Sequence, residues 1–469
     1  MLFSSMTFLF VFMPILMTIY FFAKKEIRNY ILLIASVIFY GFADMRYLAI
    51  MIMTIAINYW GALLIEKYDT SIQKRHWILG LSIIADLSFL AYFKYFNFFL
   101  KNINALLAAD FTLLDIIMPI GISFYTFQAM SYLIDVYRGE VKAQHDIYKL
   151  ALYIVLFPQL VAGPIVKYHD ICDQIDKREE TFDKVVLGLK RFIMGLAKKV
   201  LLANTLAVVA DKIFAQSVDQ ITLGYAWLGI ITYALQLYYD FSGYSDMAIG
   251  LGMIFGFKFM ENFNYPYICK SLNDFWRRWH ISLSTWFRQY LYFPLGGSRI
   301  SPLRTYINLF IVFLATGFWH GAEWTFIAWG IWNAIFIMFE HYIGWNKNKT
   351  DSFLAATGKH IYGLVVFLVG LVMFRSPDIL YSFEYIARMF HISTVDHLPN
   401  YDYGLNNKYL LAMMVGIILT LPVCRNILSV SYERKVLRTI INIWLFILFL
   451  LSAASLAGAT YNPFIYFRF

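Results

Sequence analysis

The sequence predicts an all-helical protein that crosses a membrane many times. Of its 469 residues, 60% are hydrophobic and 15% are charged, whereas ordinary soluble domains have roughly 45–50% apolar and about 25% charged residues. Uncharged apolar runs recur along the whole chain, and several are long enough to cross a hydrocarbon core of about 30 Å as a helix of roughly 20 residues. Together these observations exclude a water-soluble fold.

The apolar runs indicate about ten to twelve membrane crossings. The clearest runs are Met1–Ala23, Tyr47–Ile65, Ile116–Ile134, Ile221–Tyr239, Thr305–Ala322 and Thr439–Phe467. Shorter runs, which we expect to form tilted spans or segments inside the bundle, are Asn29–Ala43, Leu150–Val166, Trp324–Phe339, Ile361–Phe374 and Tyr409–Cys424. We therefore expect a single transmembrane domain over residues 1–469, with its catalytic centre at about residues 110–345.

The distribution of basic residues predicts the orientation of the first helices. Met1–Ala23 has no basic segment before its apolar part, and a basic cluster follows it at residues 24–28. This order is the reverse of a secretory signal, so we expect a retained first helix. Positively charged loops favour the cytoplasm, which applies to this cluster, to the loop Glu66–His76 and to Arg425–Arg438. The N-terminus is therefore predicted to lie outside the cell membrane.

The net charge of +9 does not predict nucleic-acid binding. The lysines and arginines lie in loops between apolar spans and form no basic face on a folded domain. Membrane topology and anionic lipid headgroups explain the charge more simply. Cys172, Cys269 and Cys424 are far apart in the sequence, so neither a disulfide framework nor a zinc site is indicated. We expect no metal and no tightly bound cofactor.

Residues 110–300 differ in character from the two ends of the chain. Their apolar segments are interrupted by proline and glycine, at Pro119, Gly121, Pro158, Gly163, Pro164, Gly243, Gly250, Gly252 and Gly256. Irregular backbone at membrane depth is tolerated only where protein or a water-filled cavity surrounds it. This region is therefore predicted to form re-entrant or broken helices, surrounded by the simpler helices from both ends.

The densest group of polar residues runs from Asn273 to Arg299. If Asp274–Leu291 is one helix, one arc of that helix contains Asp274, Arg277, Arg278 and Arg288, while His280 lies at the border of the arc. A charge at the bilayer centre costs roughly 2.5–3.5 kcal/mol, so this arc is expected to face a polar cavity or the cytoplasmic interface. The alternative is an amphipathic helix lying among the headgroups.

His320 stands at the end of an uncharged span, within the segment Thr316–Gly330. An ionisable group in such a place is costly and needs a partner. A histidine near neutrality can take a proton from a hydroxyl nucleophile and return it to a leaving group, which is the requirement of acyl transfer. The alternative is a buried histidine bonded to a backbone carbonyl, and sequence position does not decide between the two.

Asp240 and Asp246 lie among aromatic and small residues in the segment Gln236–Gly252. Their spacing of six does not place them on one helical face, so we expect them to satisfy arginines or backbone groups rather than to act together. Several enzyme classes are excluded because the chain has no P-loop, no dinucleotide fingerprint, no H-E-x-x-H motif and no nucleophile elbow.

At these residues the sequence resembles the membrane-bound O-acyltransferase family, in particular its bacterial alginate O-acetylation branch. The matching motifs follow one another along nearly the whole chain. They are MLFSS, FPQLVAGPI, YYDFSGYSDMAIGLG, ENFNYPY, FWRRWHISLSTWFRQYLYFPLGG and GFWHGAEWTFIAWG. One departure is Gln289, where relatives are expected to have an aspartate beside Arg288.

The resemblance implies a ring of transmembrane helices around a thin re-entrant centre, with a funnel from each side. It implies that His320 is the catalytic histidine and that His280 is the second histidine of the site. The expected donor is acetyl-CoA from the cytoplasm, with its phosphates bound by Arg277, Arg278 or loop lysines. Its thioester would reach a neck lined by Trp276, Trp279 and Trp319, and Asp240 is a further candidate for donor binding.

The resemblance also implies partners. Members of this branch usually work with a separate extracytoplasmic acetyltransferase of the Ser-His-Asp hydrolase type, and the final acceptor would be a cell-surface polysaccharide such as alginate. Two alternatives stay open. One is export of D-alanine to teichoic acid from a carrier-protein thioester, and the other is a transporter whose intramembrane histidines relay protons.

Overall fold

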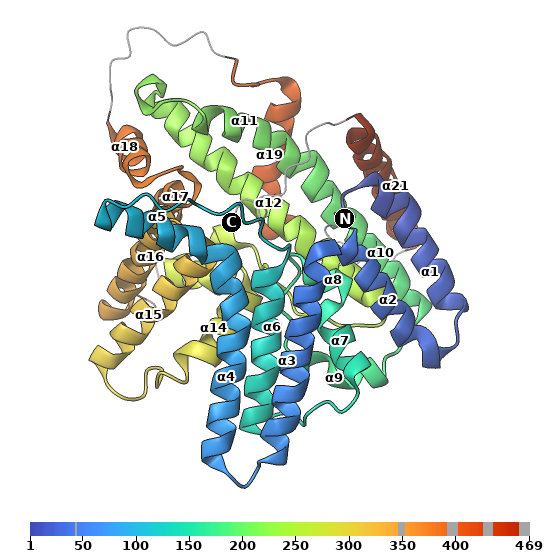
Figure 1. The fold of residues 1–469 in the computed structure, drawn as a ribbon. Coiled ribbons are helices and arrows are strands. Elements are labelled where there is room, and N and C mark those ends of the chain that lie inside the picture. Colours follow the sequence, from blue (N-terminus) through green and yellow to red (C-terminus); the bar gives the residue numbers. More distant parts are fainter. Residues whose placement is uncertain (43–44, 346–351, 392–401, 425–434, 459–469) are drawn as a thin grey trace. The chain divides into compact units, whose positions relative to one another are not determined.

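A computed structural model describes residues 1–42, 45–345, 352–391, 402–424 and 435–458. Among these residues every regular element is helical, as the sequence predicts (Figure 1). The chain separates into two compact units. Unit one contains Met1–Phe192 and Ser245–Met260, and unit two contains Ile193–Tyr244 and Glu261–Phe469.

Unit one consists of the helices of the first third of the chain. Its elements are α1 (Met13–Phe22), α2 (Arg28–Gly41), α3 (Leu48–Lys67), α4 (Ile72–Leu90), α5 (Phe96–Leu107), α6 (Ile122–Arg138), α7 (Ile147–Val155), α8 (Phe157–Leu160) and α9 (Tyr168–Asp176). Two further helices, α10 (Phe182–Ala197) and α12 (Leu223–Ile254), have residues in both units.

Helix α6 is the buried centre of unit one. Nearly every side chain from Ile122 to Val136 is buried, which is typical of a helix surrounded by protein on all sides. It runs beside α3 and α4 (Figure 1). The predicted span Ile116–Ile134 therefore becomes a helix only at Ile122. Gly121 precedes it with φ of +76°, a conformation that glycine adopts without strain.

The segment after α6 confirms the prediction of broken helices within protein. The short helices α7 and α8 are followed by an irregular stretch, and all residues from Leu152 to Tyr168 are buried. The Tyr153 hydroxyl donates to the carbonyl of Val166 at 3.0 Å, and the Gln159 side chain donates to the carbonyl of Tyr153. Side chains thus satisfy backbone groups that no helix satisfies.

Helix α12 differs from the expectation for this region, because its glycines do not interrupt it. A Cβ on Gly250 would lie 2.5 Å from the carbonyl oxygen of Gly188 in unit one, and a Cβ on Gly243 would lie 2.7 Å from that of Gly195 in unit two. The glycines therefore allow α10 to approach α12 closely. The helix ends before Gly256, whose φ is +82°.

Unit two contains the polar segment Asn273–Arg299, which is the central motif of the chain, together with the remaining helices. They are α11 (Asn204–Phe214), α13 (Leu272–Trp276), α14 (Ile281–Phe287), α15 (Pro302–His320), α16 (Trp324–Tyr342), α17 (Phe353–Arg375), α18 (Ile379–Phe390), α19 (Asn407–Leu419) and α21 (Lys435–Gly458). Helices α15 and α16 form a hairpin (Figure 1). A Cβ on Gly330 would lie 2.6 Å from the carbonyl oxygen of Phe313, so the hairpin requires glycine there.

Five of the described helical segments are long and apolar enough to cross a membrane. They are Met45–Lys67, Ile72–Leu107, Phe182–Phe214, Phe353–Arg375 and Lys435–Gly458. Two shorter apolar helices are Phe8–Phe22 and Asn407–Leu419. The number of ten to twelve crossings stays a prediction. Most of Arg425–Arg438 and the end of the run Thr439–Phe467 lie outside the described residues.

Candidate active site

The central motif is not one continuous helix, contrary to the prediction for Asp274–Leu291. Helix α13 ends at Trp276, and α14 begins at Ile281 after a break at His280. The φ of His280 is +44°, a left-handed conformation that is uncommon for residues other than glycine. Such backbone persists only where the surrounding structure fixes it, and it is concentrated at functional sites.

Asn262 fixes the backbone around His280. Its carbonyl oxygen accepts from the amide of Ile281 at 3.0 Å. Its side-chain Oδ1 accepts from the Ser282 amide at 3.1 Å and from the Ser282 hydroxyl at 2.9 Å. Two residues on, the amide of Asn264 donates to the carbonyl of Arg278 at 2.9 Å. The non-helical segment 262–264 thus holds the break between α13 and α14 in place.

The same asparagine determines the tautomer of His280. Nδ1 of His280 lies 3.2 Å from Oδ1 of Asn262. Because the Ser282 amide can only donate, the atom that it meets must be the oxygen of the Asn262 side chain. Nδ1 of His280 must therefore carry the proton, and in the neutral ring Nε2 carries the lone pair. His280 is only 1% exposed, and such burial strongly disfavours the charged imidazolium.

The structure brings His280 and His320 to the same side chain, Trp319. The ring centroids of His280 and Trp319 are 6.2 Å apart, and those of Trp319 and His320 are 4.9 Å apart. His320, at the end of α15, also contacts the rings of Trp329 and Phe374 edge-on. It is 6% exposed. The two histidines, 40 residues apart in the chain, therefore border one indole deep inside unit two.

The other two predicted tryptophans belong to the aromatic core next to this centre. The indole N–H of Trp276 donates to Oδ1 of Asn333 at 3.0 Å. Trp279 stacks on Phe275 with ring centroids 5.4 Å apart. Trp276 is one ring away from His320, through Trp329. That these tryptophans line a neck for the thioester stays a prediction.

The arginines of the motif have separate environments. Arg277 is exposed, whereas Nε of Arg278 donates to Asp274 at 2.9 Å. Arg288 is exposed and, with Gln289, lies on a π-helical turn at Arg288–Tyr292. The break at His280 means that these side chains do not form the continuous arc that a single helix would give.

The two aspartates lie in different units, and each pairs with a cation. Asp240 is bonded to Lys199 at 2.5 Å, and both side chains are buried. Asp246 is bonded to Arg191 at 2.8 Å. Asp240 thus pairs with a lysine, where an arginine or a backbone group was expected. Asp240 also precedes Phe241, whose ring meets His280 with centroids 4.6 Å apart.

Sequence reasoning missed two residues that position the site, Asn262 and Glu340. Glu340 is 2% exposed, and its carboxylate accepts from the amides of Leu272 at 2.6 Å and Asn273 at 2.9 Å. It therefore caps the N-terminus of α13, where a negative charge is favourable. A glutamate at the end of the apolar run Trp324–Phe339 is a signal that would have found it.

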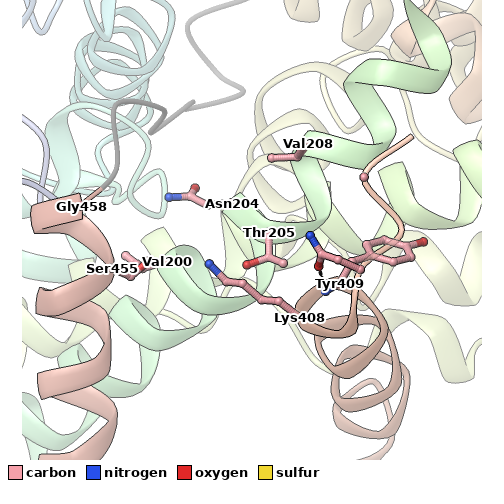
Figure 2. A pocket seen from close by; sticks show the side chains of 10 residues that line it. Val200, Asn204, Thr205, Val208, Lys408, Tyr409, Ser455 and Gly458 are labelled. Carbon is pink, nitrogen blue, oxygen red and sulfur yellow. Dashed lines mark hydrogen bonds between the residues drawn. The ribbon is translucent and has the colours of Figure 1, made fainter. Parts of the chain in front are cut away.

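A cavity of about 300 Å³ lies elsewhere in unit two, between α11, α19 and α21 (Figure 2). Its polar lining includes Asn204, Thr205, Lys408 and Ser455. None of the predicted site residues lines this cavity, so it is distinct from the histidine centre.

A model of the membrane-bound O-acyltransferase family matches residues 45–384. The chain belongs to this family. The matched range contains both histidines together with Asn262 and Glu340. The protein is therefore an O-acyltransferase, and its apolar helices make it a multi-pass membrane protein.

Three relatives show the kinds of family member that the chain is similar to. The probable alginate O-acetylase AlgI of Pseudomonas putida is 39% identical over the full length of both chains. The peptidoglycan O-acetyltransferase of Helicobacter pylori is 39% identical over 71% of this chain and 69% of its own. The teichoic acid D-alanyltransferase of Bacillus subtilis is 30% identical over 50% of this chain and 62% of its own.

Proposed function

We propose that this protein takes an acetyl group from acetyl-CoA on the cytoplasmic side and passes it across the cell membrane. The acetyl group would then O-acetylate a cell-surface polysaccharide such as alginate. The observation that carries the proposal is the convergence of His280 and His320 on Trp319. The alginate relative, similar over the full length of this chain, supports an acetyl group and a polysaccharide acceptor.

His320 is the proposed general base. An acceptor hydroxyl attacks the carbonyl carbon of the thioester, and His320 takes the hydroxyl proton as the new C–O bond forms. The C–S bond then breaks, and the proton passes to the departing thiolate. Because a thioester is already activated, accurate positioning and one base are sufficient for the reaction. The fixed tautomer of His280 would present its Nε2 lone pair as an acceptor for a hydroxyl or thiol proton.

Charged residues near the break would bind the donor. Arg277 is exposed and is the proposed contact for the phosphates of acetyl-CoA, because arginine binds phosphate with paired hydrogen bonds. Arg278 is already engaged with Asp274 and would have a smaller share in this binding. An extracytoplasmic acetyltransferase of the hydrolase type is the proposed partner that receives the acetyl group and transfers it to the polymer.

The test of this assignment replaces His320 by alanine and measures acetate on the surface polymer at equal membrane abundance. Loss of acetylation is expected, because the variant lacks the proposed general base, and such bases typically contribute 10²–10⁴-fold. The control is His341→Ala, because His341 is an exposed residue on α16 that meets the ring of Tyr306 edge-on. Acetylation that persists at the wild-type level in His320→Ala would refute the assignment.

Transfer of D-alanine is the second candidate, and the similarity to the teichoic acid D-alanyltransferase favours it. That similarity covers half of this chain at 30% identity, so acetyl transfer ranks first. Membranes that contain the protein can be supplied separately with labelled acetyl-CoA and with a carrier protein charged with labelled D-alanine. If the surface polymer acquires label from the charged carrier protein and none from acetyl-CoA, the transferred group is D-alanine.

A further inference from the structure

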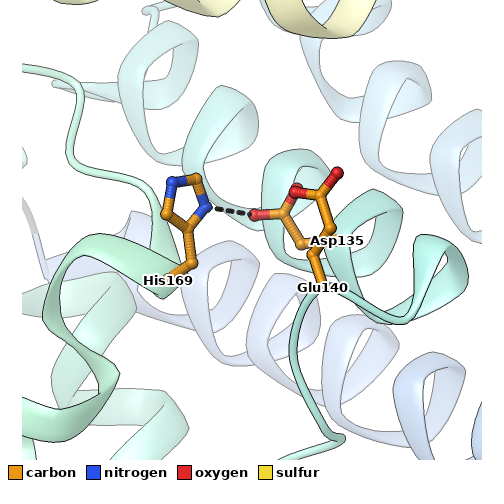
Figure 3. Close-up of side chains that lie close together, drawn as sticks. All are labelled: Asp135, Glu140 and His169. Carbon is orange, nitrogen blue, oxygen red and sulfur yellow. Dashed lines mark hydrogen bonds and ion pairs between the residues drawn. The ribbon is translucent and has the colours of Figure 1, made fainter.

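Two carboxylates and an imidazole meet at the C-terminal end of α6 in unit one (Figure 3). Asp135, Glu140 and His169 each offer one ligand atom, and these three atoms all lie within 4.8 Å of one another. Asp135 lies in the last turn of α6 and is fully buried, whereas His169 belongs to the first turn of α9. The three residues therefore join the ends of two helices.

The local fold brings Glu140 back over the end of α6. Gly139 ends the helix with φ of +74°, the left-handed conformation that commonly closes helices. The amide of Glu140 then donates to the carbonyl of Asp135 at 2.9 Å. As a result two carboxylates stand at the negative end of the helix dipole, where anions are disfavoured and a cation is favoured.

His169 faces carboxylates with both ring nitrogens. Nδ1 lies 3.0 Å from Oδ2 of Asp135, and Nε2 lies 3.1 Å from Oδ1 of Asp170. A neutral imidazole has one N–H and can donate to only one of these two oxygens. The other nitrogen can instead share a metal ion with its carboxylate. Ligands at about 2.0–2.2 Å from one ion are themselves roughly 3 Å apart, which agrees with the distance between His169 and Asp135.

We propose that Asp135, Glu140 and His169 bind one divalent transition-metal cation that joins α6 to α9. A set of one imidazole and two carboxylates suits zinc or manganese. The side chains of His169 and Glu140 are 32% and 49% exposed, so a cation can enter from water. Arg138, 3.8 Å from Glu140, forms a partly exposed pair of the kind that contributes little.

The cation itself is the probe in the experiment. Full-length protein, purified in detergent with a tag that contains no histidine, is stripped with EDTA and titrated calorimetrically with zinc chloride or manganese chloride. We expect one tight site per chain, weakened at least tenfold in His169→Asn and in Glu140→Gln. The matched control is His145→Asn, because His145 forms an exposed pair with Glu66 at 2.7 Å and belongs to no group of three ligands among the residues that the structure describes.

Thermal unfolding provides a second readout that is independent of activity. The cation should raise the unfolding temperature of the wild type and of His145→Asn, because a ligand that binds the folded state stabilises it. It should leave both site variants unchanged. The proposal would be overturned if His169→Asn and Glu140→Gln bound zinc and manganese as tightly as the wild type does. An absence of zinc and manganese binding by the wild type would also overturn the proposal.

Discussion

The conformation of His280 shows how single residues build the histidine centre. A left-handed φ of +44° is strained for a histidine, and strain of this kind costs of order 1–3 kcal/mol. Asn262 compensates for it by accepting from the amides of Ile281 and Ser282, one with its carbonyl and one with its side chain. One asparagine thus holds both the backbone of the break and the tautomer of the imidazole.

Asn262→Ala is expected to lower kcat about 10–100-fold with little change in KM, because it removes the acceptor that orients His280 and touches no predicted donor contact. A tenfold change corresponds to about 1.4 kcal/mol in the activation free energy. Asn262→Asp keeps the acceptor oxygen and should restore most of the rate. The measurement is steady-state acetyl transfer in proteoliposomes. If alanine leaves kcat unchanged, or if alanine and aspartate are equally inactive, Asn262 has no orienting role.

Between helices, the close contact of α10 with α12 likewise depends on particular residues. Gly188 and Gly250 face each other across this contact. A Cβ added to either glycine would lie 2.5 Å from the carbonyl oxygen of the other. Backbone atoms cannot move aside as a flexible side chain can, so the helices would have to separate. The contact depends on glycine at both positions.

Gly250→Ala is therefore expected to destabilise the protein by about 1–3 kcal/mol, the usual cost of overpacking. Gly80→Ala is the control, because a Cβ on Gly80, within α4, meets nothing within 4 Å. An alanine in an open helical position is favourable by up to about 1 kcal/mol. Thermal unfolding in detergent compares the two variants. A Gly250→Ala protein as stable as Gly80→Ala would contradict the close contact.

Apolar runs and proline positions predicted the helical class and the broken segment around Pro158, because both depend on local composition. The interruption of the central motif was not predictable in this way. Trp276–Ile281 contains neither proline nor glycine, and its break depends on Asn262, which is distant in the sequence. Conversely, the glycines of α12 suggested a break, but their role is in packing. The pairing of the two histidines through Trp319 is likewise a tertiary contact that spacing alone does not reveal.

Outward-facing apolar side chains indicate how the whole molecule meets its surroundings. On α21, Ile443 and Phe446 are 56% and 60% exposed, and such a surface is stable in lipid rather than in water. The orientation in the membrane remains a prediction that rests on the basic loops. Tyr137, near the end of α6, bonds at 3.1 Å to His76, which lies near the N-terminal end of α4 and within the predicted cytoplasmic stretch Glu66–His76. Because His169 of α9 contacts Asp135 of α6, α9 joins that same end of α6, which is predicted to be cytoplasmic.

Cys172, one turn after His169 on α9, tests this orientation. In a protein that carries Cys269→Ala and Cys424→Ala, a membrane-impermeant maleimide should label Cys172 in inside-out vesicles but not in intact cells. Burial, with Asp173 nearby, raises the pKa of the Cys172 thiol. The reactive thiolate is therefore scarce at neutral pH, and labelling should accelerate as the pH rises from 7 to 9. Cys172→Ser in the same background controls for other nucleophiles. Labelling of Cys172 in intact cells would contradict the predicted orientation and would place the N-terminus in the cytoplasm.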